Sequence, residues 1–244
     1  MRLRVLGSGD AFASGGRGHP AYLLEGVTGR LLLDCGPTTL PALRRCGVEP
    51  DTLDAVLLSH FHGDHFGGVP FLVLDRRYGV AGARPLLVAG PAGVEQRVGD
   101  LARALYRGGA ADAGPQFAAF LELEPDVRAP VGPAIVTPFR VPHDPGELCL
   151  GLRIEMEGRV VVYSGDTEWF DELPSRTRGA DLLLLECTHA DGTGGHHVRL
   201  PELLAHRDRL GCRQLLLTHL GTEARHAASA AGLRVADDGQ QVAL

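Results

Sequence analysis

Residues 60–65 read His-Phe-His-Gly-Asp-His and bring four metal-ligand side chains into six positions, directly after an apolar segment. Side chains two apart on an extended chain project from the same face, so His60 and His62 can converge on one cation. Asp64 and His65 follow a flexible glycine and can turn towards a second cation. Imidazoles with one carboxylate suit zinc, and manganese or iron are alternatives. The run therefore predicts a two-metal hydrolytic site.

Further ligand candidates occur where other β-like runs end. His143, Asp166 and His219 each follow a run rich in valine, isoleucine or leucine. Polar groups at the carboxyl ends of strands gather at a sheet edge. Taken singly, each of the three could be an ordinary loop residue. Taken in order after the first run, they become candidate metal ligands.

The order of these ligands resembles the metallo-β-lactamase superfamily, whose hydrolytic members carry HxHxDH followed by a His, an Asp and a His. The resemblance implies a four-layer αββα sandwich with two zinc ions at one sheet edge. It also implies that Asp166 bridges the two ions. In the implied ligand sets, one metal is held by His60, His62, His143 and Asp166, and the other by Asp64, His65, Asp166 and His219.

Within that superfamily the chain resembles the ribonuclease Z group and the cyclic-phosphate phosphodiesterases. The resemblance rests on the opening from residue 6 to Arg17, the segment 181–189, and Gly-His-His at 195–197. By this resemblance Glu186 and His197 assist catalysis. The neighbouring His196 is the alternative candidate for the catalytic acid. Glu186 could instead be only a carboxylate at a strand end, and His197 only an exposed loop histidine.

Three departures from these two families limit the substrates that we expect. Only positions 144–165 separate the third-motif His from the fourth-motif Asp, and they read as a hairpin with no room for the long arm of the bacterial transfer-RNA enzymes. The stretch 7–21 has no cysteine, unlike the zinc loop of the phosphonate enzymes. The sequence His-Val-Arg at 197–199 replaces the His-Ser-Thr of ribonuclease Z. Transfer-RNA maturation is therefore disfavoured.

The expected mechanism follows from charge. Two divalent cations lower the pKa of a bridging water from 15.7 towards ~7, which supplies hydroxide at neutral pH. Asp64 would orient this nucleophile, and His197, oriented by Glu186, would protonate the leaving alkoxide. Arg17, in a glycine-rich loop, would contact a substrate phosphate, unless it is a solvated loop arginine.

Two other function classes remain open at this stage. Thioester or lactone hydrolases of the glyoxalase II and lactonase kind share the first ligand run, and their leaving groups need less protonation. A non-catalytic metal-binding relative is the second alternative, although every expected ligand is retained here. A phosphodiesterase that acts on a small or cyclic diester is the favoured prediction.

The composition limits the kinds of partner and chemistry that we expect. The 244 residues are 44% hydrophobic, enough for one domain over 1–244, and a net charge of −6 argues against extended nucleic acid. All 24 basic residues are arginines, which excludes lysine nucleophiles. The five cysteines form no CxxC pair, and no apolar run approaches the ~18 residues of a membrane span. We expect a cytoplasmic protein; its oligomeric state is open, with relatives commonly dimeric.

The periodicity predicts many short strands with helices between them, which fits a layered α/β sandwich. A glycine- and alanine-rich stretch at 107–115 reads as a flap or a linker, and the tail from residue 235 as an edge strand. The expected strands are 2–6, 21–25, 30–34, 54–59, 85–89, 117–123, 134–141, 149–156, 159–164, 181–186 and 214–218. The expected helices are 38–46, 67–78, 92–107, 168–173, 200–210 and 222–231.

Overall fold

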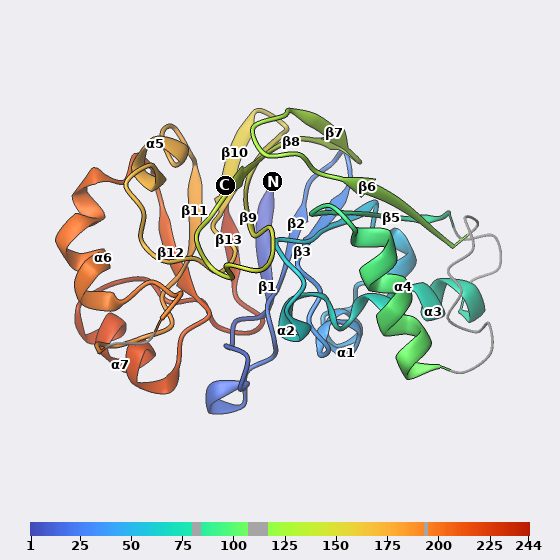
Figure 1. Cartoon of the computed structure of the whole chain (residues 1–244), viewed down its shortest axis with the longest axis horizontal. Helices are drawn as coiled ribbons and strands as arrows, with labels where there is room; N and C mark the ends of the chain where they lie inside the picture. The colour runs from blue at the N-terminus through green and yellow to red at the C-terminus, as the bar shows by residue number, and fades with distance from the viewer. Residues whose placement is uncertain (80–83, 107–116, 193–194) are drawn as a thin grey trace.

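The computed structural model describes residues 1–79, 84–106, 117–192 and 195–244. Within them the strands form two sheets that stack face to face (Figure 1). The first sheet has the order β13 (Gln241–Ala243), β1 (Arg2–Gly7), β2 (Ala21–Glu25), β3 (Arg30–Leu33), β4 (Ala55–Leu57), β5 (Leu86–Gly90) and β6 (Ala118–Glu122). The second has the order β12 (Leu215–Thr218), β11 (Leu182–Glu186), β10 (Arg159–Tyr163), β9 (Leu150–Met156), β8 (Ala134–Arg140) and β7 (Ala129–Val131).

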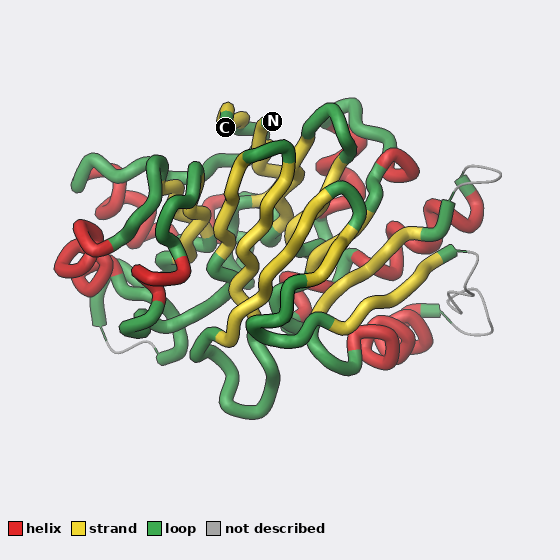
Figure 2. Tube along the Cα trace, turned by 90° about the horizontal axis from the view of Figure 1, so that it is seen from above, coloured by secondary structure: helices red, strands yellow, loops and turns green. Residues whose placement is uncertain are grey.

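Helices cover the outer face of each sheet, and Figure 2 shows the strands side by side between the two helical layers. The first sheet is covered by α1 (Thr39–Arg45), α2 (Gly63–Phe66), α3 (Val69–Tyr78) and α4 (Val94–Leu105). The second is covered by α5 (Leu173–Arg176), α6 (Leu200–His206) and α7 (Thr222–Ala230). Short 3-10 turns lie at Ser14–Gly16, Pro50–Thr52 and Arg207–Arg209. The arrangement is the αββα sandwich that the sequence predicted.

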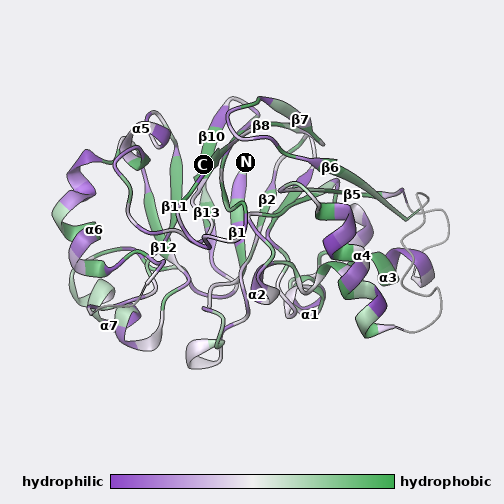
Figure 3. Cartoon of the chain, viewed as in Figure 1, coloured by the Kyte–Doolittle hydropathy of each residue, from purple (hydrophilic) through white to green (hydrophobic). Residues whose placement is uncertain are grey.

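Alternation along the strands builds the layers. In β2, Tyr22 and Leu24 enter the core between the sheets, whereas Ala21 and Leu23 face the helices. Successive strand residues point to opposite faces, so a strand covered on both sides reads as a continuous apolar run. Most apolar helix residues pack against a sheet, although Tyr78, Leu105 and Leu204 are exposed; Figure 3 shows both hydrophobic and hydrophilic residues along the helical ribbons. No helix of the described residues is long and apolar enough to cross a membrane.

Every strand expected from the sequence is present, with ends within two residues of the prediction, and the tail adds β13 as the expected edge strand. The three-residue strand β7 was not expected because it is short and contains a proline. The helix expected at 168–173 is wrong, since a helix begins only at Leu173, next to Pro174. The backbone N–H of Glu168 instead donates to the carbonyl of Pro142. The stretch 107–115 lies outside the described residues.

The hairpin of β9 and β10 fills the space between the third and fourth ligand motifs. Its turn residues, Glu157 and Gly158, have φ of 52° and 73°, the left-handed pair of a tight two-residue connection. The strands pair from Arg159 opposite Met156 to Tyr163 opposite Leu152. Positions 144–165 therefore hold a loop and a hairpin, without an inserted arm.

Close backbone approach fixes the ligand-bearing loop against the first sheet. Gly68, just after α2, donates its N–H to the carbonyl of Cys35 at 2.8 Å. A Cβ at this position would lie 2.2 Å from the backbone oxygen of Gly36. Gly63, at the start of the same helix, has open space around its missing Cβ. Only one of these two glycines is required by packing.

We therefore predict that Gly68→Ala lowers the free energy of unfolding by about 1–3 kcal/mol, as overpacking does. Gly63→Ala is the matched control and should change it by less than about 1 kcal/mol, since alanine favours a helix over glycine. Urea unfolding of both variants with excess chelator measures this. Equal effects of the two substitutions would contradict the packing argument.

Candidate metal centre

The predicted ligands come together at the edge where the strands of both sheets end. His60 and His62 follow β4, and His62 is the extended residue that precedes α2. The backbone N–H of His65 donates to the carbonyl of His62 at 2.9 Å, so one helical turn reverses the chain. Asp64 and His65 lie within this turn, which is the short helix α2, where the sequence had predicted a turn. The last three candidates follow β8, β10 and β12.

The first group of ligand atoms contains three imidazoles. His60, His62 and His143 offer nitrogens that all lie within 4.8 Å of one another. The Nδ1 of His62 is 3.2 Å from the Nε2 of His143. Asp166 joins this group through its Oδ2, which is 4.0 Å from the Nε2 of His60 and 3.8 Å from that of His143. This is the ligand set that the resemblance implies for one metal.

The second group contains Asp64, His65, Asp166 and His219 within the same 4.8 Å limit. The Oδ2 of Asp166 lies 3.2 Å from His65 Nε2 and 3.4 Å from His219 Nε2. The Oδ2 of Asp64 is 3.2 Å from each of these nitrogens. Asp166 thus contacts both groups, which is where a bridging ligand must lie.

The chemistry of these residues fits metal ions. Among the described residues, His60 Nε2 and Asp166 Oδ1 are buried polar atoms without a hydrogen-bond partner. Buried polar atoms rarely stay unpartnered, because their desolvation costs about 1–3 kcal/mol each. The Nε2 atoms of His65 and His219 face each other at 3.4 Å. A cation between such nitrogens and carboxylates satisfies all of them.

Outer contacts set which imidazole nitrogen faces the centre. The Nδ1–H groups of His65 and His143 donate to Asp34 Oδ2 at 2.6 Å and to the His196 carbonyl at 2.7 Å. The Nδ1 of His219 lies 2.9 Å from the hydroxyl of Thr188. These contacts direct the Nε2 atoms of the three rings towards the centre. In His62 the roles reverse, since its Nε2 contacts Asp144 at 3.3 Å and its Nδ1 faces the centre.

Asp34 supports the centre and was missed by the sequence analysis. This fully buried carboxylate ends β3 with a left-handed φ of 53°. It accepts hydrogen bonds from the N–H and hydroxyl of Ser59 at 2.7 and 2.8 Å, and from the Tyr163 hydroxyl at 2.6 Å. An acidic residue at the end of the apolar run 31–33 was a usable signal, because it shares the sheet edge with the ligands.

The centre concentrates charge in a buried place. Burial raises the pKa of Asp166, but His219 and His65 outweigh it and hold that pKa well below its usual range. Burial lowers the pKa of His65, but Asp166 and Asp34 raise it well above the ordinary value. Burial holds the pKa of His60 well below normal. The Asp166 carboxylate therefore stays ionised beside these imidazoles.

His197 and Glu186 form a hydrogen-bonded pair beside the ligands. The Nδ1 of His197 is 2.7 Å from Glu186 Oε1 and 4.0 Å from Asp166 Oδ2. Burial lowers the pKa of His197, but Glu186 outweighs it and raises that pKa to about 9. Glu186 is fully buried and also accepts the N–H of Thr167 at 2.9 Å. The Glu186 carboxylate thus favours the protonated form of His197.

The other two candidates lie differently. The side chain of His196 is 57% exposed and pairs with Glu168 at 2.8 Å rather than with a candidate ligand. Arg17 pairs with Asp237 at 2.9 Å, and none of its contacts within the described part of the chain reaches a ligand. The structure brings His197 to the centre, and a role for Arg17 stays a prediction.

We predict that Asp34→Asn lowers zinc affinity by about 10–100-fold, the usual effect of losing a carboxylate behind a ligating histidine. Competition with a chromophoric chelator measures the affinity, and circular dichroism checks the fold. The control is Asp181→Asn, because Asp181 accepts a backbone N–H at the opposite end of β11. An unchanged affinity in folded Asp34→Asn protein would rule out this role.

Comparison with known proteins identifies the family of the chain. A family model described as Anti-Pycsar protein Apyc1 matches residues 1–241. The protein of that name from Paenibacillus sp. (strain J14) is 32% identical over 243 residues, 95% of this chain and 94% of that protein. The probable metallo-hydrolase YhfI of Bacillus subtilis is 29% identical over 228 residues, 90% of this chain and 87% of that protein.

Solved structures agree with the fold. The crystal structure of the metallo-beta-lactamase fold protein YhfI from Bacillus subtilis aligns with a TM-score of 0.82 at 26% identity, covering 99% of each chain. The short form of human tRNase Z aligns with a TM-score of 0.80 at 22% identity, covering 100% of this chain and 99% of that one, which supports the fold alone. The chain therefore belongs to the family described as Anti-Pycsar protein Apyc1, within the hydrolases of the metallo-β-lactamase fold.

Proposed function

We propose that the chain is a zinc-dependent phosphodiesterase that uses two metal ions and cleaves a small or cyclic phosphodiester, with cyclic nucleotides as the first substrates to test. The observation that carries this proposal is the His197–Glu186 pair, 2.7 Å apart, beside ligand groups that share Asp166. A hydrolase with a poor leaving group needs such a proton donor. The hairpin at 144–165 leaves no arm to grip a long RNA.

When bound, divalent cations lower the pKa of water and neutralise charge on the phosphate. Asp64 is suited to orient the attacking water, because its side chain is 11% exposed whereas that of His65 is fully buried. The Nδ1 of His197 is held by Glu186, so Nε2–H is the proton available to the leaving alkoxide. The raised pKa of His197, about 9, keeps this proton in place at neutral pH.

The same pair weighs against the alternatives. The thiolate leaving group of a thioester needs little protonation, so a histidine that a buried carboxylate holds in its protonated form favours a substrate with an alkoxide leaving group. Burying Glu186 fully is costly unless its bonds are made, and here Thr167, Thr188 and His197 all contact it. A protein that only bound metal would have no use for this arrangement.

The first prediction is metal-dependent hydrolysis of bis(p-nitrophenyl) phosphate and of a 3′,5′-cyclic nucleotide by the zinc-loaded protein. Turnover should be lost after chelation and in Asp64→Ala, because the carboxylate both holds metal and orients water. Release of nitrophenolate and chromatography of the nucleotide measure it. Protein with two bound zinc ions that cleaves neither diester, but hydrolyses thioesters or lactones, would refute the proposal.

The second prediction separates the leaving groups. His197→Ala should lower kcat for the cyclic nucleotide by about 10²–10⁴-fold, the usual contribution of a general acid. For bis(p-nitrophenyl) phosphate the loss should be less than about tenfold, since nitrophenolate leaves without a proton. His196→Ala is the matched control and should change neither rate by more than about threefold. Equal losses for both substrates in His197→Ala would remove it as the acid.

The third prediction concerns pH. His197 must be protonated, so kcat for the cyclic nucleotide should fall as the pH rises through about 9, the raised pKa of this histidine. Glu186→Gln removes the negative charge that favours the protonated form, so the descending limb should move to lower pH. Rate profiles between pH 6 and pH 10.5, measured with metal content fixed, test this. A limb that stays in place in Glu186→Gln would assign it to another group.

A further inference from the structure

The three imidazoles of the first ligand group come from different halves of the sandwich. His60 and His62 follow β4 of the first sheet, and His143 lies in the loop 141–149 between β8 and β9 of the second. The side chain of His62 is 41% exposed, whereas those of His60 and His143 are buried. Burial holds two of these rings in place, so the position of His62 depends more on its outer contacts.

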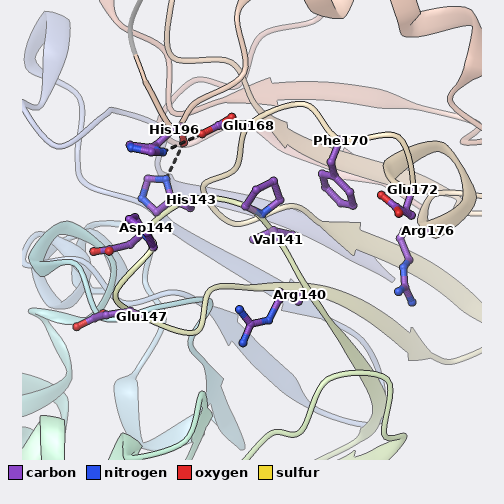
Figure 4. A pocket seen from close by; sticks show the side chains of 12 residues that line it. Arg140, Val141, His143, Asp144, Glu147, Glu168, Phe170, Glu172, Arg176 and His196 are labelled. Atoms are coloured by element: carbon purple, nitrogen blue, oxygen red, sulfur yellow. Dashed lines mark hydrogen bonds and ion pairs between the residues drawn. The ribbon is translucent and has the colours of Figure 1, made fainter.

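The loop after β8 reaches His62 through Asp144. The Oδ2 of Asp144 lies 3.3 Å from His62 Nε2. Its Oδ1 accepts the backbone N–H of Gly146 at 2.7 Å, and its carbonyl accepts that of Glu147 at 3.3 Å. Figure 4 shows Asp144 and Glu147 on this loop together with His143. Asp144 and Glu147 therefore belong to one hydrogen-bonded turn, and a displacement of this turn would carry the Asp144 carboxylate away from His62.

Arg97 joins this turn to the helical layer of the first sheet. It lies near the start of α4, and its Nη2 pairs with Glu147 Oε1. Its guanidinium carbon lies 5.5 Å from the centre of the Phe61 ring, a distance at which an aromatic face attracts a cation. Phe61 stands between His60 and His62, and its ring packs in the core between the first sheet and its helices. One side chain thus interacts with both ligand-bearing segments.

The Glu147 carboxylate depends on this pair. Glu147 is partly buried, and its Oε2 is a buried atom without a hydrogen-bond partner among the described residues. A partly buried carboxylate that loses its cation turns towards water, because leaving it unpaired costs free energy. Removal of the Arg97 charge would therefore release Glu147 towards solvent and loosen the turn that carries Asp144.

We propose that Arg97 is a positioning residue for the first ligand group, which holds the turn 144–147 against the segment 60–62. The inference rests on the metal centre of the proposed function and adds to it a residue from the helical layer. Arg97 acts through Glu147 and Phe61, so its effect should fall on the affinity for one metal ion. The effect should be modest and sensitive to salt, because the Arg97 side chain is 47% exposed.

The test is the affinity for each of two zinc ions, measured without substrate by competition with a chromophoric chelator. Arg97→Gln and Glu147→Gln should each weaken the binding of one ion by about fivefold and leave that of the other within about twofold. The double variant should resemble Arg97→Gln, since the two side chains act as one pair. In about 0.5 M sodium chloride, the difference from the wild type should shrink to less than about twofold, because salt screens exposed charges.

Two further variants separate positioning from a general effect on stability. Arg97→Lys keeps the positive charge, and should stay within about twofold of the wild type because the pair uses one nitrogen of the guanidinium. Arg103→Gln is the matched control on the same helix, since Arg103 pairs with Asp100, and should leave both affinities unchanged. Circular dichroism checks that each variant is folded.

The outcomes keep the two proposals apart. Wild-type protein that binds two zinc ions but cleaves no phosphodiester would refute the proposed function, whereas the affinities would still test Arg97. If folded Arg97→Gln protein binds both ions as tightly as the wild type, or loses affinity for both ions equally, Arg97 does not position the first ligand group. A loss in Arg97→Lys as large as that in Arg97→Gln would also overturn the inference, because the charge would then have no role.

Discussion

The buried carboxylate of Asp34 is the interaction on which both sheets and the metal centre depend. It lies at the end of β3 in the first sheet and binds the Tyr163 hydroxyl of β10 in the second at 2.6 Å. The same Oδ2 accepts from the ligand His65, also at 2.6 Å. A buried carboxylate is tolerated only when its oxygens are hydrogen-bonded, and here the N–H and hydroxyl of Ser59 supply further bonds. The packing of the sheets and the orientation of a ligand are thus fixed by one group.

Buried hydroxyl groups continue this polar network from Asp34 towards the candidate ligands on the second sheet. The rings of Tyr163 and Tyr22 lie 5.3 Å apart in the core between the sheets, and the Tyr22 hydroxyl is 2.6 Å from that of Thr218. Burial raises the pKa of both tyrosines, so their hydroxyls stay neutral. Because Thr218 directly precedes the ligand His219, the polar layer connects ligands on opposite sheets without adding charge to the core.

The sequence could predict the site residues that stand directly at the end of a strand, because a local pattern locates them. The ligands stand directly after strands, and a period of two locates strand ends well. Asp34, Thr188 and Asp144 were missed because each acts on a histidine far away in sequence, and no local pattern records such a contact. The helix expected at 168–173 failed for a related reason, since a bond to the distant carbonyl of Pro142 holds that segment as a loop.

Strands and loops contribute differently to the region around the candidate ligands. The ligands and the Glu186 carboxylate sit at strand ends, whose positions are set by cross-strand hydrogen bonds and by cores on both faces. Beside them, the loop after β8 and the segment that precedes α5 line a pocket. These two segments touch where Glu168 N–H donates to the Pro142 carbonyl at 2.8 Å. A residue in these loops can change without moving a strand, whereas a change at Asp166 would disturb both groups of candidate ligands. A fold of this kind can host different functions through changes in its loops.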